Sequence, residues 1–277
     1  MERGLERGME QCCNIIFLII LDTARSVLTR SKSLKIGILI IGSLFWDNGR
    51  GDVRKDWRED RLRINEAIDV SAPIRYGRKS SSRGDTYTMV LSMKAQLGRA
   101  KLVPCATAIN DSKDLIDEAV HLWSAESQRV RNSEVSDTWG CVGLKIRDGV
   151  VCPDEIRAQW AQVAQDKAEH FNIRYADDEL PLLNNSGILQ MAWPTKADGE
   201  PLLEVDALLV STNQPTLTPR NQYADPYDIA RAWLRCPKHD HYFYKNKEYG
   251  IKTFEDDAIL EEIWAAHHGG CGGPIVC

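Results

Sequence analysis

Hydrophobic and polar positions divide the chain into short stretches of strand and helix character, and the clearest is the run Ile36–Ile41. Every residue in this run is aliphatic except Gly37, and the run is followed by Gly42-Ser43-Leu44. A short apolar run that ends in glycine and serine is typical of a buried strand that leads into a loop. We therefore predict a central strand and a tight loop whose backbone amides face an anion, with an ordinary turn as the alternative.

The same pattern predicts further elements. Strands are expected at Val70–Tyr76, Thr86–Ser92, Arg99–Cys105, Trp139–Ile146 and Leu203–Ser211. Pro73 favours a position at the sheet edge for part of the first of these strands, Val70–Tyr76. Helices are expected over Asp111–Gln128, Pro153–His170, Tyr227–Leu234 and Phe254–Trp264. The segment Asp47–Asn65 is dense in arginine and aspartate, and it predicts an irregular excursion with a short helix and a solvated, mixed-charge face.

The helix predicted from Asp111 carries an unusual carboxylate. Steps of four, three and four residues along the apolar stripe lead from Leu115 to Glu126. A carboxylate on the inward face is desolvated, which raises its pKa toward the range useful to a general base. The alternative is that the helix has frayed by this point and that Glu126 reaches solvent. Glu118 and His121 fall on the polar side and are expected to be solvated.

A basic segment separates the first two strands that follow the Gly42 loop. Arg75–Arg83 contains four cations (Arg75, Arg78, Lys79 and Arg83) and no acid. Its glycine and serine residues supply backbone and hydroxyl donors beside the cations, which favours an anion-attracting loop. A flexible basic hairpin loop is the alternative.

Composition limits the class of protein. The chain has 277 residues, of which 43% are hydrophobic and 27% charged, as in globular proteins with a sizeable core. Its net charge of -5 gives no general argument for nucleic-acid binding. Eight cysteines at irregular spacing do not form a disulfide scaffold, so we expect reduced thiols in a cytoplasmic protein.

The N-terminal part contains a seven-residue apolar run, Ile15–Leu21. This run is too short to span a bilayer, so no membrane span is expected. A signal peptide, an interfacial anchor and a packed or poorly ordered helix remain open interpretations. We expect residues 1–33 to be an addition that packs poorly against the following domain, and residues 266–277 to form a flexible Gly/His/Cys tail.

Taken in order, these features resemble the gamma-glutamylcyclotransferase-like superfamily. That family opens with a strand ending in Tyr-Gly-Ser, whose loop holds the substrate, and continues through a small mixed barrel to a helix with the catalytic glutamate. Here Ile41-Gly42-Ser43-Leu44 matches the first motif, with Ile41 in place of the tyrosine, and Leu122–Glu126 matches the helix-end segment. The resemblance covers about residues 34–149.

The resemblance implies an α+β fold. A small mixed β-barrel of the gamma-glutamylcyclotransferase-like type, with flanking helices, would occupy residues 34–150. Residues 151–265 have no counterpart in the motifs and are expected to be a C-terminal α/β elaboration that caps the barrel or covers the mouth of the site.

The resemblance also implies a chemistry, the release of 5-oxoproline from a gamma-glutamyl amine or peptide. Glu126 would take the proton of the attacking α-amino group and pass it to the leaving amine. The amides of Gly42, Ser43 and Leu44 would hold the substrate carboxylate or the developing oxyanion. Arg75 or Arg78 would pair with an anionic group. No metal or organic cofactor is required, and the expected partner is a small molecule with a gamma-glutamyl group.

Other interpretations stay open. The main alternative is a non-catalytic protein of the same fold that binds a small anion or a partner protein. A zinc site at Cys236–His241 lacks a standard ligand spacing, and Cys105 and Cys141 lie in predicted strands without a nearby histidine, as core cysteines do. Nucleic-acid binding by residues 75–83 conflicts with the acidic balance, so no nucleic-acid partner is expected.

Overall fold

The computed structural model describes residues 33–129, 134–177, 179–236 and 241–268. All of these except Ser33 belong to one unit that begins at Leu34. The expected N-terminal addition, with its apolar run Ile15–Leu21, therefore lies outside the described residues apart from Ser33. Residues 269–277 of the expected tail lie outside them as well.

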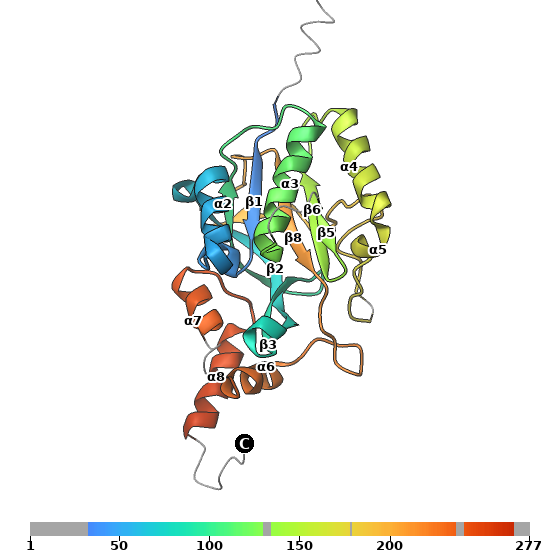
Figure 1. The fold of residues 1–277 in the computed structure, drawn as a ribbon. Coiled ribbons are helices and arrows are strands. Elements are labelled where there is room, and N and C mark those ends of the chain that lie inside the picture. Colours follow the sequence, from blue (N-terminus) through green and yellow to red (C-terminus); the bar gives the residue numbers. More distant parts are fainter. Residues whose placement is uncertain (1–32, 130–133, 178, 237–240, 269–277) are drawn as a thin grey trace, which may run out of the picture. The chain divides into compact units, whose positions relative to one another are not determined.

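An eight-stranded, mostly antiparallel sheet forms the centre of this unit (Figure 1). Its order is β3-β2-β4-β1-β8-β6-β5, with β7 paired to β2. The strands are β1 (Ile36–Ile40), β2 (Ile68–Ser80), β3 (Thr86–Leu91), β4 (Leu97–Pro104), β5 (Ser136–Asp137), β6 (Gly140–Ile146), β7 (Thr195–Lys196) and β8 (Ala207–Asn213). All five residues of β1 are buried between β4 and β8, so the prediction of a central buried strand is confirmed.

The expected closed barrel is not formed, whereas the broader α+β class is confirmed. The hydrogen-bonded order runs from β3 to β5 and stays open among the described strands. The sheet curves along β2, because the first half of this strand pairs with β4 and its second half pairs with β3. The partner changes between Pro73 and Ile74, and a register shift between Tyr76 and Arg78 follows within the half that pairs with β3, where a β-bulge increases the local bend and twist of a strand. β3 thereby comes within 8 Å of β8, Cα to Cα, without a ladder between them.

Helices cover this sheet and extend beyond β3. They are α2 (Val53–Arg61), α3 (Ser112–Ser127), α4 (Asp154–Asp166), α5 (Ala168–Phe171), α6 (Pro226–Leu234), α7 (His241–Glu248) and α8 (Asp256–His268). Figure 1 shows α3 in front of the central strands and the orange to red helices α6, α7 and α8 grouped beyond β3. The Asp111 side chain caps α3 by accepting a bond from the Asp114 amide, as its sequence predicts.

Several local predictions differ from the structure. Pro73 is not on an outer strand of the sheet; it lies where β2 exchanges partners, and its carbonyl accepts a bond from the Ser92 amide. The helix expected over Pro153–His170 is divided at Lys167 into α4 and α5. Helix α8 continues past Trp264 to His268, so it includes the first residues of the expected tail.

Two predictions of solvated charge are wrong. Glu118 is only 3% exposed, because Arg61 on α2 approaches its carboxylate to 3.0 Å. Arg54 and Arg58 on α2 are also buried. Trp57 and Arg58 follow Arg54 at i+3 and i+4, so the three side chains share the inward face of α2, and the two arginines donate to groups of the neighbouring loop and of α3.

Candidate functional site

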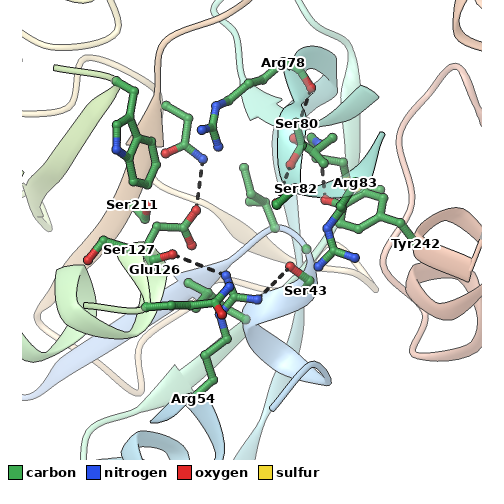
Figure 2. Close-up of a pocket in the computed structure, with 18 of the residues that line it drawn as sticks. Ser43, Arg54, Arg78, Ser80, Ser82, Arg83, Glu126, Ser127, Ser211 and Tyr242 are labelled. Atoms are coloured by element: carbon green, nitrogen blue, oxygen red, sulfur yellow. Dashed lines mark hydrogen bonds between the residues drawn. The ribbon is translucent and has the colours of Figure 1, made fainter. Parts of the chain in front are cut away.

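A pocket of about 410 Å³ opens where the central strands and α3 end (Figure 2). β1 and β8 are parallel, so their carboxyl ends meet at one edge of the sheet. The Gly42–Leu44 loop follows β1 at this edge, and Asn213 ends β8. The last turn of α3 brings Glu126 to the same place. The pocket volume is within the range of small-molecule sites.

The pocket brings together five of the six site residues expected from the sequence. The loop residues line it together with the strand cation and the helix carboxylate: Gly42, Ser43, Leu44, Arg78 and Glu126. Arg75 lies elsewhere. Its guanidinium is 2.5 Å from Glu255 Oε1 and stacks 4.2 Å above the Tyr223 ring, so it joins β2 to the segment before α8.

Glu126 is half-buried rather than buried, and it faces the pocket. α3 is intact at this point and ends at Ser127, where Gln128 adopts a left-handed conformation. The Asn213 side-chain amide donates to Glu126 Oε1 at 3.3 Å. No other side chain in the described ranges hydrogen-bonds this carboxylate. The remaining lone pairs of Glu126 are therefore free to accept a proton or a hydrogen bond from a ligand.

The Gly42 loop is fixed by side chains that approach it from other elements. Gly42 has an extended backbone (φ -177°), so its lack of a side chain is required by space rather than by backbone conformation. A Cβ atom there would lie 2.5 Å from Tyr242 Oη. Arg58 donates to the Leu44 carbonyl at 2.9 Å. The amides of Ser43 and Leu44 make no backbone hydrogen bond within the described part of the chain.

Arg54 joins this loop to the end of α3. Arg54 is 5% exposed, and its guanidinium donates to the carbonyls of Ala125, at 3.0 Å, and Glu126, at 3.3 Å. A cation is favourable at this position because the last carbonyls of a helix lack intrahelical partners and carry partial negative charge. The same guanidinium approaches Ser43 Oγ to 3.4 Å. The sequence prediction missed Arg54, although its i,i+3 spacing from Trp57 is a signal that could have identified an inward position.

Asp47 forms ion pairs with two of the arginines around the pocket. Its Oδ2 atom accepts bonds from Arg54 at 2.9 Å and from Arg83 at 2.6 Å, and Oδ1 accepts from the Gly49 amide. Burial by itself would raise the pKa of Asp47. The Gly49 hydrogen bond and the two guanidiniums outweigh burial and hold that pKa below its usual value.

Arg78 remains as a cation without a compensating partner. Tyr76 pairs with Met89 and Arg78 with Thr88, so the register shift at Gly77 turns Arg78 to the opposite face of the strand from Tyr76. The Arg78 guanidinium stacks 4.4 Å above the Trp139 ring, and it makes no ion pair or side-chain hydrogen bond within the described residues. Burial lowers its pKa, and the nearby Glu126 carboxylate opposes this effect.

The second half of the chain also contributes to the pocket. Ser211 on β8 is 7% exposed, and its Oγ atom has no hydrogen-bond partner in the part of the chain that the structure describes. A buried hydroxyl without a partner is uncommon in a folded protein, and one that lines a pocket is available to a ligand or to water. Tyr242 on α7 lines the opposite side (Figure 2). Neither residue belongs to a recognisable spacing pattern, so neither can be identified as a site residue from the sequence.

Other candidate chemistries receive little support from the geometry. Burial raises the pKa of the Cys105 thiol, and it raises that of Cys141 to about 12, which disfavours thiolate nucleophiles. Most of the Cys236–His241 segment lies outside the described residues. Within the described ranges, no three His, Cys, Asp or Glu side chains are grouped as metal ligands.

No helix in the described ranges has the length and apolar character needed to cross a membrane.

Comparison of the chain with protein-family models, with curated proteins and with solved structures finds no match. The site must therefore be interpreted from its own chemistry. It combines a partly buried cation that has no ion-pair partner among the described residues, Arg78, with a carboxylate that has free lone pairs, Glu126. This arrangement suits a ligand that carries both a negative and a positive group.

Proposed function

We propose that the protein is a cyclotransferase-type enzyme that acts on a gamma-glutamyl amine or peptide and releases 5-oxoproline. The observation that carries this proposal is the shared pocket of the Gly42 loop and Glu126, which the sequence separates by strands β2, β3 and β4. The resemblance to the gamma-glutamylcyclotransferase-like superfamily, proposed from short motifs, requires these two elements to meet.

The polarity of the pocket supports a gamma-glutamyl ligand. Such a ligand carries an α-carboxylate and an α-amino group on one carbon, and an amide three carbons away. Arg78 and the amides of Ser43 and Leu44 can donate to the carboxylate, while Glu126 accepts from the amine. The volume of about 410 Å³ accommodates an amino-acid derivative or a dipeptide.

The proposed reaction needs only proton transfer and acyl transfer. Glu126 accepts a proton from the α-amino group, and the amine nitrogen forms a bond to the gamma-carbonyl carbon. The resulting oxyanion is stabilised by donors that line the pocket. When the intermediate collapses, the bond to the original amide nitrogen breaks, and Glu126 returns its proton to the leaving amine. The products are 5-oxoproline and a free amine, and no electrons are exchanged with a cofactor.

The decisive experiment measures 5-oxoproline release from a panel of gamma-glutamyl peptides and amines by the parent protein and by Glu126→Gln. We expect the variant to lose at least about 100-fold in kcat, the usual contribution of a general acid–base group. Glu261→Gln, a substitution at an exposed position on α8 outside the pocket, is the control and should retain parental activity. Equal release by the parent and Glu126→Gln would contradict the assignment of the base.

A second candidate function is the binding of a small anion without catalysis. The excess of cations around the pocket favours it, since five arginines line the space beside a single carboxylate: Arg50, Arg54, Arg78, Arg83 and Arg129. A parent protein that binds glutamate or 5-oxoproline in calorimetry, but releases no 5-oxoproline from any gamma-glutamyl compound, would establish this function in place of the enzyme.

A further inference from the structure

Tyr242 reaches the Gly42 loop from a part of the chain that the sequence motifs do not explain. It lies in the first turn of α7, and its ring extends from that helix into the wall of the pocket (Figure 2). The hydroxyl oxygen lies so close to Gly42 that a Cβ atom there would be 2.5 Å away. The pocket edge at Gly42 is therefore shared between the loop and this phenol.

The hydroxyl group of Tyr242 is a donor without an acceptor. Its oxygen accepts a bond from the Met89 amide on β3, at 3.2 Å. The Asn246 side chain on the same helix opposes the rise in the pKa of Tyr242 that burial causes, as a donor to the phenolic oxygen does, and no hydrogen bond among the described residues has a group that accepts the phenolic proton. A phenol has one proton to donate as well as lone pairs that accept, so the Met89 bond leaves the donor function available. Burial raises the pKa of Tyr242, which keeps the proton in place at neutral pH.

The position of this donor is well defined. Tyr242 is 3% exposed, and its ring contacts Trp46, with centroids 6.1 Å apart. The Arg83 guanidinium lies 5.0 Å above the ring centroid, and Arg83 is itself fixed by Asp47. A hydrogen-bonding group that is held in one orientation before the ligand arrives loses little conformational entropy on binding.

We propose that the Tyr242 hydroxyl donates a hydrogen bond to the ligand carboxylate at the Gly42 loop, so that α7 completes the substrate site. This inference rests on the proposed function, because it assigns the α-carboxylate of the gamma-glutamyl group to this end of the pocket. It gives a role in substrate binding to the C-terminal part of the chain. The carboxylate is present in both the substrate and 5-oxoproline, so the bond contributes equally to the ground state and the transition state.

The test compares Tyr242→Phe with the parent and with Tyr244→Phe. Phenylalanine keeps the buried ring and removes only the hydroxyl group. Tyr244 lies on the same helix, is 47% exposed and does not line the pocket, so it controls for general effects on α7. We would measure the Kd of 5-oxoproline by calorimetry, and KM and kcat with the best gamma-glutamyl substrate. Near-UV circular dichroism would verify that each variant is folded.

We expect Tyr242→Phe to raise the Kd of 5-oxoproline and the KM about tenfold, with kcat changed less than threefold. Tyr244→Phe should stay within twofold of the parent in all three quantities. A structural role alone would lower the folded fraction without this selective rise in KM and Kd. A Tyr242→Phe protein with parental KM and Kd would overturn the inference while the proposed function stands.

The two proposals can also fail separately in the other direction. If the parent releases no 5-oxoproline but binds it, and Tyr242→Phe weakens that binding tenfold, the enzyme assignment fails and the role of Tyr242 stands. If the folded parent neither turns over gamma-glutamyl compounds nor binds 5-oxoproline, both proposals are overturned.

Discussion

The close approach of Gly42 and Tyr242 makes a quantitative prediction about stability. Replacing Gly42 with alanine adds one methyl group at a position with an extended backbone, so the substitution introduces no left-handed strain. The methyl carbon would lie 2.5 Å from Tyr242 Oη, whereas ordinary contact begins at 3.4 Å. The phenol cannot move freely, because Met89, Trp46 and Arg83 hold it.

The expected changes in the free energy of unfolding follow from two contacts of Tyr242 Oη, one with position 42 and one with the Met89 amide. Overpacking of this kind costs about 1–3 kcal/mol in the free energy of unfolding. Tyr242→Phe removes the hydroxyl oxygen and leaves the Met89 amide without its acceptor, which costs about 1–2 kcal/mol. In the double variant the nearest ring atom to the new methyl group is Cζ at 3.4 Å, which is ordinary contact. The double variant should therefore cost about as much as Tyr242→Phe alone, so the second substitution relieves the first by about 1–3 kcal/mol.

Urea denaturation of the parent, both single variants and the double variant measures this coupling as a double-mutant cycle. The matched cycle uses Gly42→Ala with Tyr244→Phe, whose exposed ring has no contact with the loop; these effects should add within about 0.5 kcal/mol. Additive effects of Gly42→Ala and Tyr242→Phe would refute the reasoning, because they would mean that the hydroxyl does not occupy the space beside Gly42.

Two ion pairs give further predictions, each measured by urea denaturation. Asp47→Asn should cost about 2 kcal/mol at pH 7. The pKa of Asp47 is lowered in the folded protein, so its contribution to the free energy of unfolding is complete above pH 3.8. The difference in this free energy between the parent and Asp47→Asn should therefore shrink as the pH falls below 3.8. A constant difference down to about pH 3 would contradict this prediction. Arg61→Met should cost about 3 kcal/mol at pH 7, because it leaves Glu118 buried and unpaired. Burial raises the pKa of Glu118, so this cost should be smaller near pH 4, where the carboxylate is protonated. Arg63→Met breaks an exposed ion pair at 3.7 Å and an exposed hydrogen bond to the Ala106 carbonyl at 3.3 Å, and it should cost less than about 1 kcal/mol at either pH.

The elements that the sequence predicted well are those whose signal is local. The aliphatic run of β1, the capped start of α3 and the apolar stripe that leads to Glu126 depend on neighbouring residues along one strand or one helix. The path of the sheet is different, because a barrel and an open curled sheet have the same strands and the same alternation. Which one forms depends on whether the outer strands β3 and β5 pair, and no pattern within either strand encodes this.

The charged residues of α2 show a second limit of sequence interpretation. A segment rich in arginine and aspartate is usually solvated, and this rule predicts a solvated face for the whole of Asp47–Asn65. Arg54 and Arg58 are nevertheless buried, because carbonyl groups at the end of α3 and in the Gly42 loop supply their acceptors. These acceptors come from distant parts of the chain. The i, i+3, i+4 spacing of Arg54, Trp57 and Arg58 indicates that these arginines share the face of the tryptophan, but it cannot identify what they bind.

The distribution of charge around the pocket connects these features to the ligand. Five arginines line the space, yet Arg54 and Arg83 both pair with Asp47, and Arg129 pairs with Asp137 at 2.6 Å. Arg50 is exposed, so Arg78 is the one partly buried cation left without a carboxylate partner in the described part of the pocket. A site with one such cation selects a ligand with one carboxylate at that position. For the proposed gamma-glutamyl ligand, loss of the Asp47 carboxylate would leave Arg54 and Arg83 to compete with Arg78 for the α-carboxylate, and the orientation that presents the α-amino group to Glu126 would lose its advantage. We therefore expect Asp47 to affect the orientation of this proposed ligand as well as the stability of the loop.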